Sequence, residues 1–398
     1  MKVLQINNVY AEKSTGKITR ELHQGLLQAG IESVVVYGRG VGAREKGVIR
    51  LCPEWYGKAN SLLSRITGLP YGGCLLSTAR LKRIILREKP DVVHLQCVNE
   101  HFVNIYRLVE WLKKHRIKTV CSLHAEFMYT ANCGYAFDCD QWHHGCTRCP
   151  NKRKSTKSWF FDRTGSSWRR MKRAFEGFEK DCVICPVSPW TEERGKQSDI
   201  LRNFSFRTVY NGVNTDEIFY WDRETVKSEK TVLNVTSFFS DEPGQIKGGA
   251  YLIELARRMP DVIFQVAGKA PQIAGLPENL VLLGEVCDQR ELAEYYRKAR
   301  LFVMVSKKET FSMPCAESLC CGTPVVGFRA GAPEQISLPA FSGFVDQGDL
   351  SGLEQTLRQW LAREDLDPAN IADAAREAYS VQTMVRRFVE IYRSMLWN

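Results

Sequence analysis

The sequence predicts an α/β protein built from two doubly wound domains. Short apolar runs of the strand type alternate with amphipathic helical segments along almost the whole chain, which is typical of parallel sheets covered on both faces. The length of 398 residues suits two domains of roughly two hundred residues each. The alternation weakens around residues 198–206, where we place the linker between the domains.

The first domain is predicted over residues 1–203. Its strands are expected where five-residue runs are apolar and rich in β-branched side chains, at Lys2–Ile6, Ser33–Tyr37, Asp91–Leu95, Thr119–Leu123 and Val183–Val187. Its helices are expected at Ile18–Gln28, which Gly30 would close, and at Arg80–Glu88 and Phe102–His115. A segment at about 131–175, rich in Cys, Trp and basic residues, breaks the alternation and is predicted to be an insertion.

The second domain is predicted over residues 204–380. Its strands are expected at Thr231–Val235, Val262–Ala267, Val281–Leu283, Leu301–Val305 and Val325–Val326. Its helices are expected between these strands, at 248–258, 289–299, 314–321 and 350–363. A last amphipathic helix, at 381–398, is expected to pack back on the first domain. Because ligands of doubly wound sheets bind outside the carboxyl ends of the strands, the two domains are expected to face a central cleft.

Charge is distributed unevenly along the chain. Residues 1–190 contain 31 Lys and Arg against 16 Asp and Glu, a net charge of +15, whereas the remainder carries −5. The amino-terminal part should therefore attract something anionic, such as a phospholipid surface, a lipid-linked phosphate or nucleic acid. The first residues resemble a strand rather than an export signal, and no apolar run approaches the roughly 20 residues of a spanning helix. The 14 cysteines then indicate thiols or metal ligands in a reducing compartment, and we predict a cytoplasmic protein.

The stretch 308–326 carries the most informative pattern in the chain. The apolar run 301–305 is expected to be a buried strand, and a polar loop carrying Glu309 follows it. Ser312 offers a hydroxyl for the N-cap of the next helix, which carries Glu317 in its first turns. Backbone amides at a helix N-terminus would then lie between two carboxylates. A sugar joined to a diphosphate needs this combination, because carboxylates accept from its hydroxyls and amides hold its phosphates.

Three shorter motifs precede this stretch in the chain: Asn211-Gly212-Val213-Asn214, Lys247-Gly248 and Gln265-Val266-Ala267-Gly268. In order and spacing the four motifs resemble the family 4 retaining glycosyltransferases, which have two Rossmann-like domains in the GT-B arrangement. The resemblance covers roughly residues 205–330, and the amino-terminal half matches more loosely through its strand pattern and His124. The segment Cys133–Pro150 resembles members of the family that act in bacterial exopolysaccharide, colanic acid and O-antigen assembly.

The resemblance implies roles for individual residues. Glu309 would accept hydrogen bonds from the donor sugar, Lys247 would neutralise the departing diphosphate, and His124 would bind the donor sugar or an acceptor hydroxyl. The residues implied in donor binding are Glu317 for the ribose, Gly268 beneath the nucleotide, and the amides of Phe311, Ser312 and Met313 for phosphate. Many relatives carry an Arg shortly before the lysine, but Thr236–Ser240 contains none. Diphosphate neutralisation would then rest on Lys247, helix N-termini or a residue of the first domain.

Each of these residues also has an ordinary structural explanation. Glu309 and Glu317 are carboxylates of the kind that a helix dipole favours in solvent. A lysine before glycine, as at Lys247, is often a solvated loop residue. A histidine at the end of a strand, as at His124, can simply satisfy a buried amide.

The stretch Ser14–Lys17 is similar to a phosphate loop but is not a Walker sequence, because Ala11 and Ile18 replace required residues. We expect a glycine-containing loop between the first strand and the first helix. In that loop Gly16 would allow close backbone approach to the donor, and Lys17 would meet an anionic acceptor. An N-capped helix start is an equal alternative.

The insertion contains four cysteines in the pattern Cys-x5-Cys-x6-Cys-x2-Cys, namely Cys133, Cys139, Cys146 and Cys149. Four thiolates could hold a tetrahedral structural zinc, with His143 and His144 as spare ligands. Free thiols and two disulfides are the alternatives. No catalytic metal is expected, because Lys247 and helix dipoles would take the place of a cation. Cys182 and Cys185 lie within an apolar strand and are expected to be core residues.

Residues 152–173 combine nine Lys or Arg residues with a single acid, Asp162. Four aromatic residues are interleaved with them: Trp159, Phe160, Phe161 and Trp168. Basic residues with aromatics suit an anionic membrane interface. Single-stranded nucleic acid and a solvated helix with a few core aromatics are the alternatives, and the lack of a recognisable nucleic-acid module disfavours the first.

These observations predict a cytoplasmic enzyme, peripheral on the inner face of the plasma membrane. It would move a sugar from a UDP- or GDP-linked donor to a hydroxyl of a lipid-linked glycan. The reaction would be a step in the assembly of a bacterial surface polysaccharide. Retention at the anomeric carbon is implied by the resemblance alone. The enzyme alternative is a sugar-nucleotide epimerase or phosphorylase of similar architecture. The non-enzyme alternative is a nucleic-acid-binding protein, although no nucleic-acid partner is expected.

Overall fold

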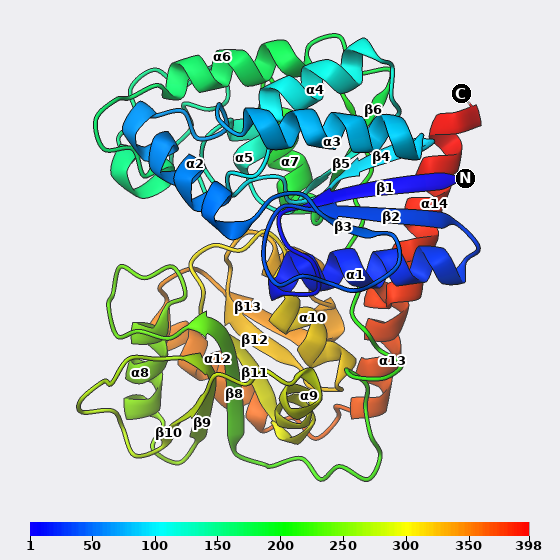
Figure 1. Cartoon of the computed structure of the whole chain (residues 1–398). Coiled ribbons are helices and arrows are strands. Elements are labelled where there is room, and N and C mark those ends of the chain that lie inside the picture. Colours follow the sequence, from blue (N-terminus) through cyan, green and yellow to red (C-terminus); the bar gives the residue numbers. More distant parts are fainter. Residues whose placement is uncertain (398) are drawn as a thin grey trace. The chain divides into compact units, whose positions relative to one another are not determined.

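The computed structural model describes residues 1–397 and divides the chain into two compact units. Unit 1 comprises Met1–Tyr210 together with the chain from Met384 onward, and unit 2 comprises Asn211–Thr383. Each unit contains one parallel sheet with helices (Figure 1), as the predicted α/β class with two Rossmann-like domains requires. The first crossing between the units, after Tyr210, comes later in the chain than the predicted boundary at residue 203.

Unit 1 is built on seven parallel strands in the order β3-β2-β1-β4-β5-β6-β7. The strands are β1 (Lys2–Asn7), β2 (Glu32–Tyr37), β3 (Val48–Arg50), β4 (Val92–Leu95), β5 (Thr119–Leu123), β6 (Cys182–Pro186) and β7 (Ser205–Phe206). This is the order of a dinucleotide-binding sheet, and it reverses between β1 and β4. All four residues of β4 are buried, as expected for a parallel strand covered on both faces.

The helices of unit 1 lie on both sides of this sheet, with α1 on one side and α3 and α4 on the other (Figure 1). They are α1 (Lys13–Gln28), α2 (Glu54–Thr67), α3 (Leu75–Glu88), α4 (Ile105–Lys114), α5 (Phe127–Thr130), α6 (Thr164–Phe175) and α7 (Pro189–Gln197). Helix α4 illustrates why these segments form helices. Its apolar residues recur at helical spacing and are buried, and the side chain of Asn104 caps the helix by accepting from the Arg107 amide at 3.0 Å. Within the predicted insertion, regular structure is limited to a short π-helical turn, Lys152–Thr156, and α6.

Unit 2 repeats the same strand order with six parallel strands, β10-β9-β8-β11-β12-β13. They are β8 (Thr231–Phe238), β9 (Ile263–Lys269), β10 (Leu280–Gly284), β11 (Leu301–Met304), β12 (Val325–Phe328) and β13 (Ser342–Val345). The helices are α8 (Gly249–Arg258), α9 (Gln289–Lys298), α10 (Met313–Cys320), α11 (Pro333–Ile336), α12 (Leu350–Leu361) and α13 (Pro368–Tyr379), with a 3-10 turn at Pro339–Phe341. The sheet reverses its order between β8 and β11.

The last helix, α14 (Val381–Trp397), returns the chain to unit 1. Phe388 and Tyr392 pack against His94 of β4, and the Tyr392 hydroxyl lies 2.6 Å from Nδ1 of His94. Burying an aromatic side chain of this size stabilises a fold by about 1.5–3 kcal/mol. The segment from Met384 is therefore a structural part of unit 1. No helix within residues 1–397 combines the length and the apolarity needed to cross a bilayer.

Candidate functional site

Two loops of unit 2 meet where its sheet reverses strand order. β8 and β11 are neighbours at this point, and the segments that follow them carry Lys247 and Glu309. The Lys307 amide donates to the carbonyl of Ile246 at 2.7 Å and so holds the two loops together. Ligands of doubly wound sheets bind at this reversal, outside the carboxyl ends of the strands. The topology therefore selects these two loops as the candidate site of unit 2.

Lys247 and Glu309 form an ion pair here, with Nζ 2.7 Å from Oε1, and their side chains are 29% and 14% exposed. The backbone of Glu309 is fixed on both sides: its amide donates to Ala330 at 3.0 Å, and its carbonyl accepts from Ala332 at 3.2 Å. The ammonium group has three donors and the carboxylate has two oxygens, so both retain bonding capacity for a ligand. The pair thus offers a cation for phosphate and a carboxylate for hydroxyl groups side by side.

Gly248 allows the two loops to approach each other. It precedes α8 with φ +70°, and a Cβ atom there would lie 1.9 Å from the carbonyl oxygen of Val305. We expect Gly248→Ala to destabilise the protein and to weaken binding of the expected nucleotide-sugar donor, because relief of this clash would move Lys247 away from Glu309. Melting temperature and donor titration measure the two effects.

Gly275→Ala is the matched control for Gly248→Ala. Gly275 has φ +68°, but nothing lies within 4 Å of the position that a Cβ atom would take. This variant should lower the free energy of unfolding by only about 1–2 kcal/mol, because alanine is strained in a left-handed backbone conformation, and it should leave donor binding unchanged. Equal losses of stability in the two variants would show that the contact with Val305 is unimportant.

Glu317 lies in α10 and is almost completely buried. The hydroxyl of Tyr296, from α9, donates to its Oε2 at 3.2 Å. Burial, together with the charge of Glu317, raises the pKa of Tyr296 well above its usual value, so this hydroxyl keeps its proton. The contact fixes the direction of the Glu317 carboxylate. Tyr296 therefore helps to orient a site residue. It was not predicted from the sequence, because nothing in the residues around it indicates this role.

The amino-terminal end of α10 lies between the two carboxylates in the sequence, as predicted, but its cap differs from the prediction. Ser312 precedes the helix with φ +79°, and its hydroxyl donates to Sγ of Cys315 at 3.1 Å instead of accepting from a backbone amide. The expected hydroxyl cap is therefore wrong. Ser312 and Met313 stand at the start of α10, where backbone amides have no partner within the helix. They remain suited to an anion, whereas the Phe311 side chain is buried.

Gly268 lies near the end of β9, where two strands approach closely. A Cβ atom at this residue would lie 2.2 Å from the carbonyl oxygen of Thr236. Glycine is therefore required by the packing of β9 against β8, which is a structural reason that is independent of any ligand.

In unit 1, His124 directly follows β5. Its Nε2 lies 2.7 Å from Oε1 of Gln96, and Nε2 of Gln96 donates to Gln5 Oε1 at 3.1 Å. Because the amide nitrogen of Gln96 is directed to Gln5, its oxygen accepts from His124, which therefore carries its proton on Nε2. Burial lowers the pKa of His124 to about 4. The imidazole is therefore neutral at pH 7.

Gly16 and Lys17 lie within α1, which begins at Lys13, and not in a loop as predicted. The chain enters α1 through left-handed backbone at Ala11, before the helix, and at Lys13, its first residue. The amide of Ala11 donates to the carbonyl of Gly16 at 3.0 Å. A Cβ atom at Gly16 would lie 3.1 Å from the Val9 side chain. Gly16 thus permits close approach of this turn, and Lys17 is half-buried beside it.

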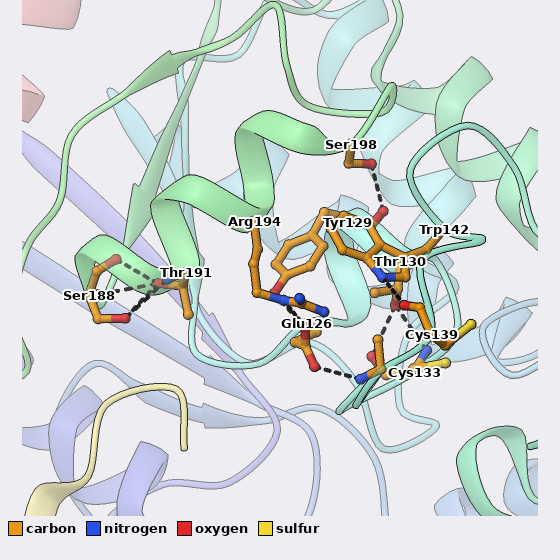
Figure 2. A network of polar contacts seen from close by, with 11 residues as sticks. Glu126, Tyr129, Thr130, Cys133, Cys139, Trp142, Ser188, Thr191, Arg194 and Ser198 are labelled. Atoms are coloured by element: carbon orange, nitrogen blue, oxygen red, sulfur yellow. Dashed lines mark hydrogen bonds and ion pairs between the residues drawn. The ribbon is translucent and has the colours of Figure 1, made fainter. Parts of the chain in front are cut away.

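A buried carboxylate, Glu126, anchors the Cys-rich segment to unit 1 (Figure 2). Its Oε1 accepts from Nε of Arg194 at 2.6 Å and from the Tyr129 hydroxyl at 2.9 Å. Its Oε2 accepts from the amide of Ala136 at 2.5 Å. The Arg194 guanidinium also lies 4.8 Å from the ring of Trp142. This network was not predicted, since its members lie far apart in the sequence.

The four cysteines of the segment are free thiols. Every pair among them is close enough for electrostatic interaction, and burial is the largest cause of a raised pKa at three of them, Cys133, Cys146 and Cys149. Within residues 1–397, however, no group of three or more His, Cys, Asp or Glu side chains is arranged so that it could hold a metal ion. Cys182 and Cys185 are buried in β6, as predicted.

Zinc in this cluster stays a prediction. We expect about one zinc per chain in protein purified without chelator, because binding would draw together four thiols that are already neighbours. Cys146→Ser should remove the metal and lower the melting temperature. Cys287→Ser, at an exposed cysteine of unit 2, is the control. A metal content that is unchanged by Cys146→Ser, or absent from the unmodified protein, would end the zinc hypothesis.

Comparison with known proteins gave two family matches. The sequence model of "Glycosyltransferase Family 4" matches residues 15–217, and that of "Glycosyl transferases group 1" matches residues 229–363. The Escherichia coli (strain K12) protein WcaC, which carries the name colanic acid biosynthesis glycosyl transferase, is 24% identical over 416 residues, covering 99% of this chain and 100% of WcaC.

Solved structures share the fold at low sequence identity. Sucrose-phosphate synthase from Thermosynechococcus elongatus has a TM-score of 0.67 at 15% identity, covering 100% of this chain and 99% of that structure. Anabaena HepE in complex with UDP has a TM-score of 0.66 at 13% identity, covering 99% and 100%.

Proposed function

Because this chain belongs to glycosyltransferase family 4, we propose that it transfers a sugar from a nucleotide diphosphate donor to a hydroxyl of a glycan, with retention at the anomeric carbon. The observation that carries the proposal is the Lys247–Glu309 pair, at the strand-order reversal of unit 2 and beside the start of α10. The ammonium group of Lys247 suits the phosphates of such a donor, and the carboxylate of Glu309 can accept hydrogen bonds from its sugar hydroxyls.

Different residues of unit 2 bind different parts of the donor. Lys247 and the amides of Ser312 and Met313 neutralise charge that develops on the departing diphosphate. Glu309 accepts from hydroxyls of the sugar and so orients its anomeric carbon. Glu317, directed by Tyr296, accepts from the hydroxyls of the ribose.

We propose a front-face reaction, since the site's carboxylates are used for hydroxyl groups. The acceptor oxygen forms a bond to the anomeric carbon while the bond from that carbon to the phosphate oxygen breaks. The acceptor's proton passes to an oxygen of the departing phosphate, so no separate base is needed. His124, neutral at pH 7, accepts a hydrogen bond from a hydroxyl of the donor sugar or of the acceptor.

A catalytic metal has no part in this proposal. Two Asp-x-Asp triplets occur in the chain, at 138–140 and 365–367. The first lies in the Cys-rich segment of unit 1. In the second, Asp365 pairs with Arg363 and Asp367 caps α13, so both carboxylates have structural partners. Neither triplet lies in the loops that carry Lys247 and Glu309.

The acceptor is proposed to be lipid-linked and the enzyme to work as a peripheral protein at the inner, cytoplasmic face of the plasma membrane. The name of WcaC, a full-length relative, supports surface polysaccharide assembly. The excess of basic residues in 1–190 supports an anionic surface as the partner.

A thermal-shift panel of UDP- and GDP-linked sugars, followed by a transfer assay with the stabilising donor, tests the proposal. We expect one donor to raise the melting temperature, turnover to require an acceptor glycan, and the product to keep the donor's anomeric configuration by NMR. Turnover without an acceptor would indicate an epimerase, and turnover only with inorganic phosphate would indicate a phosphorylase. Salt-dependent DNA binding without donor binding would favour a nucleic-acid-binding protein.

A further inference from the structure

Helix α2 turns its apolar side chains towards solvent. Trp55, Leu62, Leu63 and Ile66 are 68%, 49%, 49% and 40% exposed. They recur at helical spacing along one face, and the buried positions of the helix are instead Gly57 and Ser64. A surface helix normally does the opposite, burying its apolar stripe and exposing its polar face. An apolar stripe left outside points to an apolar partner.

A second exposed apolar segment lies against the carboxyl end of α2. Trp159, Phe160 and Phe161 are 48%, 66% and 51% exposed. The amide of Trp159 donates to the carbonyl of Arg65 at 2.9 Å. A Cβ atom at Gly68 would lie 2.5 Å from the carbonyl oxygen of Phe161, so glycine is needed for this contact.

We call these two elements together the α2–aromatic surface: Trp55, Leu62, Leu63, Ile66, Trp159, Phe160 and Phe161. The predicted role of Trp168 in such a surface is corrected, because Trp168 is only 5% exposed and packs inside unit 1.

Positive charge surrounds this surface. Lys58 on α2 is exposed, as are Arg153, Lys157 and Arg163 around the aromatic segment. The Arg163 guanidinium lies 5.4 Å from the ring of Phe161.

The neighbouring acids are already engaged. Glu54 pairs with Arg39 at 3.4 Å, and Asp162 accepts from the amide of Cys149 at 2.7 Å and from Thr164. Bonds from neutral donors leave the charge of Asp162 in place, but the four exposed cations outnumber this one acid. The net charge around the surface is therefore positive, which suits anionic headgroups.

We propose that the α2–aromatic surface inserts into the interfacial layer of an anionic bilayer, with its leucines and aromatic rings at the headgroup–acyl boundary. Trp and Phe favour this layer, and a helix with one apolar and one polar face lies in its plane. A second copy of the chain fits less well, because a symmetric contact would bring Lys58 and Arg163 of both copies together. The inference deepens the proposed function, since it names the surface that would reach a lipid-linked acceptor.

Flotation of the full-length protein with vesicles tests the insertion. Phosphatidylcholine vesicles with and without phosphatidylglycerol are compared, using the unmodified chain and the variant Leu62→Ser/Leu63→Ser/Phe160→Ser. We expect binding to the anionic vesicles, and a loss of at least about tenfold in the triple variant, since three apolar side chains no longer leave water. The substituted side chains are exposed, so the melting temperature should not change.

Two controls distinguish insertion from nonspecific hydrophobic adsorption and from electrostatic attraction alone. Leu27→Ser/Leu86→Ser/Val226→Ser removes three exposed apolar side chains elsewhere and should bind as the unmodified protein does. Arg169→Gln/Arg170→Gln/Arg173→Gln removes exposed charges of α6 and should weaken binding mainly at low salt. The part of the binding that depends on Leu62, Leu63 and Phe160 should persist at higher salt.

Three results would overturn the inference: no binding of the unmodified protein to anionic vesicles, unchanged binding of the triple variant, or a dimer in solution that the triple variant abolishes. Transfer to a soluble acceptor analogue is measured for the same proteins. The triple variant should keep that activity, so a variant that loses only vesicle binding identifies the α2–aromatic surface as the membrane contact. Absence of transfer in the unmodified protein would instead contradict the proposed reaction.

Discussion

Glu309→Ala should reduce sugar transfer by about a hundred- to a thousandfold, the effect of losing one preorganised electrostatic contact to a transition state. The substitution removes the acceptor for the sugar hydroxyls and the partner that holds Lys247 at 2.7 Å. The fold should survive, because the loop is held by backbone bonds from residue 309 to Ala330 and Ala332. Initial transfer rates and the melting temperature of the same preparation measure both statements.

Glu254→Ala is the matched control for this prediction. Glu254 is also an ion-paired glutamate of unit 2, on α8 with Arg257 and Arg258, but it is 41% exposed and should be dispensable for transfer. Glu309→Gln keeps a hydrogen-bond acceptor and loses the charge, so it should retain more activity than Glu309→Ala. Near-normal turnover of Glu309→Ala would remove this carboxylate from the site.

Glu126→Gln should destabilise unit 1 by about 3–5 kcal/mol, since it leaves the largely buried guanidinium of Arg194 without its counter-charge. The neutral amide cannot accept from Arg194, Tyr129 and the Ala136 backbone as the carboxylate does. The Cys-rich segment should loosen first, because one of these bonds is its anchor. Chemical denaturation followed by fluorescence measures the loss.

Glu193→Gln controls for the charge change, because Glu193 is an exposed neighbour of Arg194 on α7. Its effect should stay within about 0.5 kcal/mol. The double variant Glu126→Gln/Arg194→Gln should be less unstable than the sum of the single changes, since the two side chains interact directly. Equal stability of Glu126→Gln and Glu193→Gln would show that the network does not hold the segment.

The pattern of strands and helices was predictable because each parallel strand is a short apolar run between turn residues. β4 and β11 illustrate this, since every residue in both strands is buried. The positions of Glu309 on a loop and Glu317 in a helix followed from the same local signals. The class of protein followed from the order of the motifs, and the two family matches confirm it.

What the sequence could not show depends on contacts between distant residues. Lys247 and Glu309 are 62 residues apart, and Glu126 and Arg194 are 68 apart, so no local pattern pairs them. The start of α1 was missed because Glu12 precedes it without a side-chain cap. Helix α2 has a clear apolar periodicity, but periodicity alone does not tell whether the stripe faces the core or the solvent.

The return of the chain to unit 1 at Met384 has a consequence for biosynthesis. A nascent chain that has emerged through Tyr210 has all seven strands of the first sheet but lacks Phe388 and Tyr392, which cover His94. That patch of the sheet stays open while the ribosome translates unit 2, which can fold as an independent segment in the meantime. We therefore expect the first unit to mature last, once the segment from Met384 has emerged, and chains truncated before this segment to depend on chaperones.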